Sequence, residues 1–298
     1  MFILPKKATI IEVGPRDGLQ NESMIVPPDV KVRFIEALQQ SGITEMEITS
    51  FVSPKWVPQM ADAVQIVSES PKNGRQIVLT PNEKGVVRAL ESGANSVAVF
   101  VGVSDSFNKK NINKTTAESM HELKPIVEQL KKDGVFVRAC ISTAFYCPFE
   151  GKINKESTLA ICEEFTSWGV DELSVADTIG MADPVESYEL FSYLKEELSE
   201  TVLLTAHFHD TRKMALANIF ASLQAGIDRF DTSAGGLGGC PFAPGATGNV
   251  ATEDVVHMLH HMDIDTGIDI NKLCEAIDLI AGYVSKPIES GMYRLYKQ

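Results

Sequence analysis

Short apolar, β-branched runs alternate with amphipathic segments along this chain, and the alternation occurs eight times. The runs begin about 31 residues apart on average, which fits one strand, one loop and one helix per unit. Several runs are continuously apolar, as expected of parallel strands that are buried on both faces. Eight such units in 298 residues predict a closed (β/α)8 barrel, which commonly takes about 250 residues. The predicted strands are Thr9–Val13, Glu45–Ser50, Gln76–Thr80, Ser96–Val103, Phe136–Thr143, Glu172–Thr178, Leu204–Asp210 and Arg229–Gly235.

The amphipathic segments between these runs predict the helices of the barrel and a helical segment after it. Several of them stop at a glycine that fits a helix C-cap, such as Gly42 and Gly169. We therefore expect an α/β protein of one domain, with a TIM barrel over about residues 9–262 and a short helical extension over about 263–298. A doubly wound open sheet is the alternative, but such sheets rarely have eight regular units. The predicted helices are Val30–Ser41, Thr116–Asp133, Asn154–Trp168, Glu186–Glu200, Thr211–Ala225, Thr252–Met262 and Asn271–Val284.

Composition limits the partners and the compartment of such a chain. The formal net charge of −13 argues against nucleic-acid binding, although a local basic patch can still hold an anionic small molecule. The longest apolar run, Ser96–Val103, is too short to span a membrane, and the residues before the first predicted strand are too few for a signal peptide. Five cysteines at irregular spacing support neither a zinc knuckle nor a disulfide scaffold. We expect a cytoplasmic protein with no nucleic-acid or membrane partner.

Polar residues gather where the predicted strands end, which is where active sites of barrel enzymes lie. The first strand runs into Gly14-Pro15-Arg16-Asp17-Gly18, and the sixth carries Ser174, Asp177 and Thr178. The last strand runs into a glycine-rich loop that contains Cys240 and ends at Asn249. These strand ends predict a catalytic site at that face of the barrel.

The most specific signal is the pair His207 and His209 on the seventh predicted strand. Side chains two residues apart on a strand point to the same face, so both imidazoles can bind one metal ion. The alternative is that one of them is a hydrogen-bonded core residue. Asp17 and Asn249 lie within reach in a closed barrel. Two imidazoles with two oxygen ligands suit Mg²⁺ or Mn²⁺ better than zinc.

Three further features have both a structural and a functional interpretation. Arg16 could form an ion pair at the strand end, or it could present a fixed guanidinium to a developing enolate oxygen. Cys240 could be a passive small residue, or a thiol that the glycine-rich loop brings to the substrate as a general acid. Lys109, Lys110 and Lys114 could be a solvated charge run, or the site of an anionic nucleotide tail.

The motifs together resemble those of the 3-hydroxy-3-methylglutaryl-CoA lyase family. The resemblance extends from about Thr9 to Met262 and is strongest in the cysteine-containing glycine loop. The matching segments are VGPRDGLQNE (13–22), TSFVSPKWVPQ (49–59), KNIN (110–113), LSVADTIG (173–180), HFHDTR (207–212) and GGLGGCPFAPGATGN (235–249).

The resemblance implies metal-dependent cleavage of 3-hydroxy-3-methylglutaryl-CoA to acetyl-CoA and acetoacetate, in a protein that forms a homodimer. It implies Arg16 as the enolate stabiliser and Cys240 as a catalytic thiol, while the base could be His207, Asp17 or a water. The remaining implied roles are Mg²⁺ or Mn²⁺ ligation by Asp17, His207, His209 and Asn249, acidic support from Glu47 and Asp177, and acyl or CoA contacts from Gln20, Ser50, Asn111, Ser174 and Thr178.

Two alternatives remain open from the sequence. The first is a related barrel enzyme, either a citramalyl-CoA-type lyase or a condensing acyl transferase of the isopropylmalate or homocitrate synthase type. Such synthases usually add a C-terminal region, for which the roughly 36 residues after Met262 leave little room. The second is a non-catalytic, metal- or ligand-binding barrel.

Overall fold

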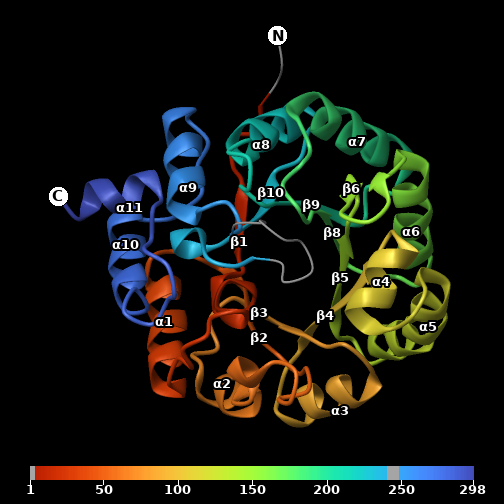
Figure 1. Cartoon of the computed structure of the whole chain (residues 1–298), viewed down its shortest axis with the longest axis horizontal. Coiled ribbons are helices and arrows are strands. Elements are labelled where there is room, and N and C mark those ends of the chain that lie inside the picture. Colours follow the sequence, from red (N-terminus) through yellow and green to blue (C-terminus); the bar gives the residue numbers. More distant parts are fainter. Residues whose placement is uncertain (1–3, 240–247) are drawn as a thin grey trace.

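The computed structural model describes residues 4–239 and 248–298, and its centre is a closed barrel of eight parallel strands. Around the barrel the strands follow the order β1-β10-β9-β8-β5-β4-β3-β2, so β1 pairs with both β2 and β10. Figure 1 looks down the barrel and shows the helices as an outer ring. The predicted barrel is therefore confirmed, and the open sheet is not the fold.

Each of the eight barrel strands begins and ends within three residues of its predicted run. The largest difference is at the last strand, which ends at Thr232 because the chain enters a short helical turn, Ala234–Gly236 (η3), in which Gly235 has a φ of 74°. The strands are β1 Thr9–Glu12, β2 Glu45–Ser50, β3 Arg75–Leu79, β4 Ser96–Gly102, β5 Phe136–Ser142, β8 Glu172–Asp177, β9 Leu203–Phe208 and β10 Arg229–Thr232.

All seven predicted helices are present. The others in the described residues are α2 Ala63–Glu69, α3 Glu83–Glu91, α4 Asp105–Ile112, α11 Gly291–Tyr296 and the 3₁₀ turn η2 Pro58–Met60. The predicted helices correspond to α1 Pro28–Gln40, α5 Thr116–Lys132, α6 Lys155–Ser167, α7 Pro184–Glu197, α8 Ala215–Gln224, α9 Thr252–His261 and α10 Ile270–Asp278.

The largest differences from the predicted helices are two helix boundaries and one small hairpin. Helix α8 begins at Ala215 rather than at Thr211, since Lys213 has a left-handed φ of 59°. Helix α10 ends at Asp278, short of the predicted Val284. A small hairpin after β5, formed by β6 (Tyr146–Cys147) and β7 (Gly151–Lys152), was not predicted, because two-residue strands carry no periodic signal.

Alternation along β5 shows how the strands divide their side chains between two cores. Val137, Ala139 and Ile141 belong to the apolar layer between the strands and the outer helices. Arg138 and Cys140 point the other way, into the barrel, as the two-residue period of a strand requires. The barrel interior thus has an apolar part, built mainly on β1, β3 and β4, and a charged part around Arg138.

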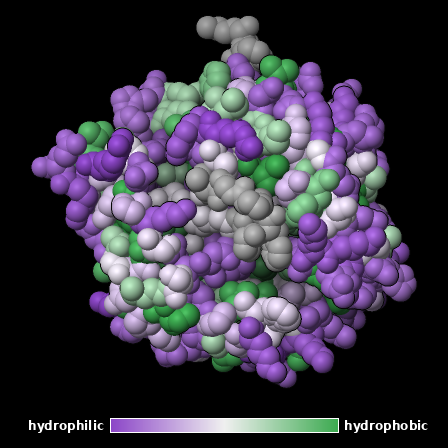
Figure 2. Space-filling model, in the orientation of Figure 1, coloured by the Kyte–Doolittle hydropathy of each residue, from purple (hydrophilic) through white to green (hydrophobic). Residues whose placement is uncertain are grey.

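The segment after the barrel packs on the side where the barrel closes. Helix α10 lies against α1, and α11 lies against α9, as Figure 1 shows. Figure 2 shows that the viewed face is mainly hydrophilic, with small separated apolar patches, in keeping with the acidic composition. In the described part of the chain, every helix is too short or too polar to cross a bilayer.

Candidate active site

A single π-helical turn after β1, Gly14–Gly18 (η1), presents Arg16 and Asp17 to the open end of the barrel. The Val13 carbonyl accepts backbone hydrogen bonds from Arg16, Asp17 and Gly18 at 3.2, 2.7 and 3.1 Å. The Gly14 amide donates to the carboxylate of Glu12 at 2.7 Å, and a Cβ at Gly14 would lie 2.6 Å from that oxygen. Glycine is therefore required there.

Arg16 lies between two carboxylates. Its Nε donates to Glu47 Oε2 at 2.6 Å, and its Nη1 lies 2.5 Å from Asp17 Oδ1. Burial would lower the pKa of this guanidinium, but the charges of Glu47 and Asp17 outweigh burial and raise its pKa. Arg16 is thus a fixed cation in the site. Both interpretations of Arg16 are compatible with this geometry, because a guanidinium held by two ion pairs can still present its remaining N–H groups to a substrate.

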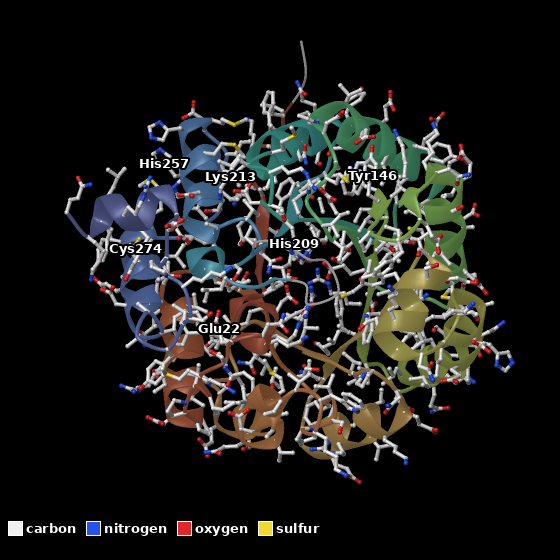
Figure 3. The ribbon with its side chains drawn as sticks, viewed as in Figure 1. Glu22, Tyr146, His209, Lys213, His257 and Cys274 are labelled. Atoms are coloured by element: carbon white, nitrogen blue, oxygen red, sulfur yellow. The ribbon has the colours of Figure 1, made fainter. Side chains whose placement is uncertain are left out.

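Asp17, His207 and His209 form the metal-ligand cluster. Each offers one ligand atom, and these atoms lie within 4.8 Å of one another. The two imidazole rings are 5.3 Å apart between centroids, as expected for side chains two residues apart at the end of β9. Figure 3 places His209 near the centre of the barrel opening, whereas His257 and Cys274 lie on the outer C-terminal helices.

Electrostatics in this cluster favour a cation. Burial would raise the pKa of Asp17, but Arg16, His207, His209 and the hydrogen bond from Asn249 together lower it, so the carboxylate is ionised. Burial would lower the pKa of His207, but the hydrogen bond and charge of Asp231, and the charge of Asp17, raise it. A carboxylate beside two imidazoles offers the mixed oxygen and nitrogen ligands that divalent ions accept.

Asn249 completes the candidate ligand set. The chain at 248–250 pairs with the end of β9, because the Gly248 carbonyl accepts from Asp210 N and the Val250 amide donates to Phe208 O, both at 3.1 Å. Asn249 Nδ2 donates to Asp17 Oδ2 at 2.8 Å and to the Leu237 carbonyl at 3.1 Å. Its Oδ1 is buried and accepts no hydrogen bond from the residues that the structure describes. A buried carbonyl oxygen beside Asp17 fits a metal ligand.

Two residues that the sequence argument did not single out support this cluster. Asp231 on β10 lies 3.0 Å from His207 Nδ1, and Arg138 on β5 donates to both carboxylate oxygens of Asp231. The Arg138 guanidinium also lies 3.6 Å from Glu47. A signal was present: each is a charged residue inside a predicted buried strand, and buried charges occur in pairs.

Three residues at the end of β8 have other partners than the sequence predicted. Asp177 was expected beside the metal and Arg16, but its carboxylate accepts from the amides of Met181 and Ala182, both at 2.9 Å. Burial raises the pKa of Asp177 to about 6. Ser174 is buried and donates to Asp231 at 2.7 Å, and Thr178 Oγ1 accepts from the Thr143 amide at 2.8 Å. Direct roles for these three residues in catalysis or substrate binding stay predictions.

The other predicted substrate contacts are spread around the rim. Ser50 is fully buried and donates to the Leu79 carbonyl at 3.2 Å. Gln20 is half-buried, and its Oε1 has no hydrogen-bond partner in the described ranges, which leaves an acceptor for a ligand. Asn111 is half-buried on α4. Their contacts to the acyl group or CoA stay predictions.

The lysines after β4 do not form one continuous patch. Lys110 lies over the Phe149 ring, 3.7 Å from its centroid, and Lys114 pairs with Glu122. Lys109 is exposed near the end of α4. These lysines are therefore partly engaged within the protein. An anionic nucleotide tail at this rim stays a hypothesis.

Two cysteines, Cys240 and Cys140, are relevant to the site. Cys240, the predicted catalytic thiol, lies outside the described residues. Cys140 lies in the barrel interior with its sulfur 3.7 Å from Glu47 Oε1, close to the site rather than in the outer core. Burial and the charge of Glu47 raise the pKa of the Cys140 thiol well above its usual range, so it stays protonated and unreactive.

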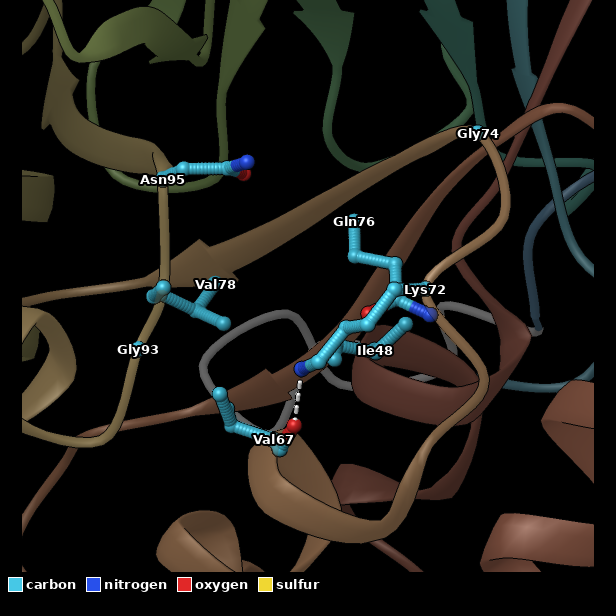
Figure 4. Close-up of a pocket in the computed structure, with 9 residues that line it drawn as sticks. Ile48, Val67, Lys72, Gly74, Gln76, Val78, Gly93 and Asn95 are labelled. Carbon is cyan, nitrogen blue, oxygen red and sulfur yellow. Dashed lines mark hydrogen bonds between the residues drawn. The ribbon is translucent and has the colours of Figure 1, made fainter.

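A small pocket at the opposite end of the barrel does not belong to this site. Gln76 near the start of β3 and Asn95 just before β4 line it, and the Lys72 ammonium donates to the Val67 carbonyl inside it (Figure 4). The starts of barrel strands serve stability, whereas chemistry takes place at their carboxyl ends. Nothing catalytic is assigned to this pocket.

The fold and the residues at its open end define the class: a (β/α)8 barrel enzyme with a candidate metal centre at the carboxyl ends of its strands. A family model described as HMGL-like matches residues 7–280. The chain belongs to this HMGL-like family.

Two curated relatives are similar over almost the whole chain. The hydroxymethylglutaryl-CoA lyase YngG of Bacillus subtilis (strain 168) is 43% identical over 295 residues, which cover 98% of each chain. The cytoplasmic 3-hydroxy-3-methylglutaryl-CoA lyase of Homo sapiens is 42% identical over 289 residues, which cover 96% of this chain and 78% of the human one.

Solved structures agree with these relatives. The crystal structure of the B. subtilis HMG-CoA lyase has a TM-score of 0.94 and 43% identity, covering 99% of both chains. An HMG-CoA lyase from A. baumannii in complex with coenzyme A and 3-methylmalate has a TM-score of 0.92 and 37% identity, covering 99% of this chain and 96% of that one.

Proposed function

We propose that this protein is a divalent-metal-dependent carbon–carbon lyase that cleaves 3-hydroxy-3-methylglutaryl-CoA to acetyl-CoA and acetoacetate. The single observation that carries the proposal is the double use of Asp17. Its Oδ1 accepts from Arg16, and its Oδ2 accepts from Asn249 beside the two histidines. The candidate metal site and a fixed guanidinium therefore lie side by side. A retro-Claisen cleavage needs both, one for the hydroxyacid and one for the leaving enolate.

The cation would be held by Asp17, His207, His209 and Asn249. The cluster supports this set, as does the Oδ1 of Asn249, which has no hydrogen-bond partner within residues 4–239 and 248–298. When bound, Mg²⁺ or Mn²⁺ supplies Lewis-acid polarisation of the substrate hydroxyl and carboxylate oxygens. The choice between these two ions belongs to the same proposal and rests on the oxygen-rich ligand set.

The protein's own groups then have distinct tasks. A base takes the hydroxyl proton, and His207, Asp17 or a water could be that base. The carbon–carbon bond breaks, its electron pair goes to the acetyl-CoA enolate, and the former hydroxyl becomes the ketone of acetoacetate. Arg16 stabilises the enolate oxygen. A proton returns to the enolate carbon from Cys240 or from a water.

The names of the relatives support the choice of substrate. Curated relatives at 42–43% identity are named as hydroxymethylglutaryl-CoA lyases, and one solved relative is described with coenzyme A bound. We therefore propose an acyl-CoA substrate for this chain. A citramalyl-CoA-type lyase, a condensing synthase and a non-catalytic barrel are the alternatives to be tested.

The test is product formation from three candidate reactions. We expect acetoacetate and acetyl-CoA in equal amounts from 3-hydroxy-3-methylglutaryl-CoA with Mg²⁺ or Mn²⁺. Citramalyl-CoA, and acetyl-CoA with a 2-oxoacid acceptor, should react far more slowly. Faster turnover of citramalyl-CoA or net condensation would replace the proposed substrate. Absence of all three reactions in folded, metal-loaded protein would favour the binding barrel.

Oligomeric state and compartment are proposals as well. We propose a homodimer in the cytoplasm. The location rests on the relatives that are named as cytoplasmic, whereas others are named as mitochondrial. Light scattering on the purified chain would test the dimer, since a mass near 32.6 kDa would mean a monomer.

A further inference from the structure

A buried charged network beneath the site is not used by the chemistry described above. Arg138 is 0% exposed and Asp231 is 3% exposed, and their strand neighbours Ala139 and Phe230 belong to the apolar packing outside the barrel. Burying a guanidinium and a carboxylate in a barrel interior is costly unless each is fully paired. We propose that Asp231, held by Arg138 and Ser174, is a positioning residue that fixes the tautomer of His207.

Asp231 receives three donors from three other strands. Arg138 on β5 donates to both carboxylate oxygens, Ser174 on β8 donates to Oδ2 at 2.7 Å, and His207 on β9 lies 3.0 Å away through Nδ1. Because each partner is on a separate strand, the closed barrel fixes the direction of every contact. The carboxylate cannot rotate away without breaking an ion pair.

This arrangement decides which ring nitrogen of His207 carries the proton. Asp231 faces Arg138 and Ser174 as an acceptor, and a carboxylate can only accept. His207 Nδ1 must therefore donate to it. The lone pair is left on Nε2, so Nε2 is the nitrogen that can bind a metal ion. Carboxylate or carbonyl partners commonly orient metal-binding histidines in this way.

Arg138 also lies close to Glu47, the carboxylate that holds Arg16. Its Nη1 lies 3.6 Å from Glu47 Oε1, and Glu47 in turn accepts from Arg16 Nε at 2.6 Å. Arg138 is thus placed between the two carboxylates that hold His207 and Arg16.

The test uses the full chain, stripped of metal, and does not need turnover. In wild type at alkaline pH, ¹⁵N NMR of the histidine rings should show His207 protonated on Nδ1. In Asp231→Asn, the amide can donate to Nδ1 and favour the opposite tautomer, as an Asp-to-Asn change does in the Ser-His-Asp triad. Mn²⁺ affinity, measured by calorimetry, should then fall about 10–100-fold.

Two variants separate positioning from general stability. Glu172→Gln changes an equally buried carboxylate that lies 3.9 Å from Arg138 but is not a partner of His207. It should destabilise the fold but leave the His207 tautomer unchanged. Its Mn²⁺ affinity should stay within about twofold of wild type. Ser174→Ala removes one donor to Asp231 and should weaken Mn²⁺ less than Asp231→Asn does.

The outcomes are distinct. Protonation of His207 on Nε2 in wild type would overturn the proposal even if Asp231→Asn does not fold. So would an equal loss of Mn²⁺ affinity in Asp231→Asn and Glu172→Gln. The proposal rests on the metal site of the proposed function, but not on its reaction. Correct tautomer and Mn²⁺ binding without lyase turnover would refute the reaction alone.

Discussion

At the scale of single residues, Asp17 organises the site because each of its oxygens has a different partner. One oxygen holds Arg16 and the other holds Asn249, while both histidines lie within ligand distance. Arg16 is in turn held by Glu47. The site is therefore positioned before any ligand arrives, and preorganised charge is a large part of enzymatic rate acceleration.

Replacing Arg16 should cost turnover. Arg16→Met should lower kcat about 10²–10³-fold or more, because the enolate oxygen loses its stabilising cation. Arg16→Lys should recover little, since an ammonium cannot reproduce the planar fork that Glu47 and Asp17 hold. The measurement is kcat for acetoacetate release in each variant.

Arg33→Met is the matched control for that experiment. Arg33 is exposed and pairs only weakly with Asp29 at 3.4 Å, so it should keep wild-type kcat. If Arg16→Met kept kcat within a factor of three of wild type, the role given to Arg16 would be wrong.

At the scale of elements, the ends of neighbouring strands are fitted to one another by close backbone contacts. Gly180, just after β8, has a φ of 59°, and a Cβ there would lie 2.6 Å from the His209 carbonyl and 2.9 Å from the Thr211 amide. The loop after β8 therefore packs directly on the backbone that carries the candidate metal ligands His207 and His209. Only glycine permits this approach.

Gly180→Ala should destabilise the fold and disturb the metal site together. The left-handed φ alone costs about 1–2 kcal/mol, and the backbone collision adds to it. Gly93→Ala is the control, because Gly93 has a φ of 93° but nothing within 4 Å of its added Cβ. Urea unfolding and Mn²⁺ affinity should both change in Gly180→Ala, whereas Gly93→Ala should change unfolding only. Equal effects of the two variants on Mn²⁺ affinity would contradict the coupling between Gly180 and the metal site.

The sequence predicted the elements well where periodicity carries the information. The eight strands follow from the β–α rhythm. The proximity of His207 and His209 follows from their spacing, because a strand period of two fixes which side chains share a face. The end of β10 could not be predicted, since it depends on Glu12 accepting from the Ala234 amide across 222 residues. Long-range contacts of this kind leave no local pattern.

Partners of buried polar groups were the least predictable part of the site. Asp177 was expected near Arg16, but its carboxylate holds two amides of its own loop. Ser174 was expected to contact substrate, but it supports Asp231. Asp177 lies at the expected strand end, and Ser174 lies three residues before it on β8. Which neighbour a side chain meets there depends on strand tilt and on side-chain rotamers, which the spacing along the chain does not encode.

At the scale of the whole molecule, two buried carboxyls join the barrel closure to the C-terminal segment. Glu12 on β1 accepts from the Ala234 amide and the Thr252 hydroxyl, at 2.9 and 2.6 Å. Thr252 is a buried donor in the first turn of α9 (Thr252–His261). Glu253 accepts from the Gly235 amide at 3.1 Å and from Ser290 in the C-terminal segment.

These carboxyls give stability a definite pH dependence. Burial raises the pKa of Glu12 and of Glu253 from 4.5 to about 7. Between these pH values the folded state binds more protons than the unfolded state, so stability falls as pH rises from about 4.5 through 7. Glu12→Gln keeps a neutral group there. From pH 5 to pH 8, the free energy of unfolding of Glu12→Gln should rise relative to that of wild type by about 3 kcal/mol.

Urea unfolding at several pH values measures this difference. The exposed Glu91→Gln is the control and should run parallel to wild type at every pH. A Glu12→Gln curve that also stays parallel to wild type would show that Glu12 is ionised in the folded state across the range.

The central claim is that one divalent cation, held by Asp17, His207, His209 and Asn249, supports the lyase reaction. The most direct test is a Mn²⁺ titration of EDTA-stripped protein in which bound metal and acetoacetate release from 3-hydroxy-3-methylglutaryl-CoA are followed together. We predict that both saturate at one Mn²⁺ per chain, and that His209→Ala abolishes both. Turnover that is unchanged after stripping, or metal binding that His209→Ala leaves intact, would contradict the claim.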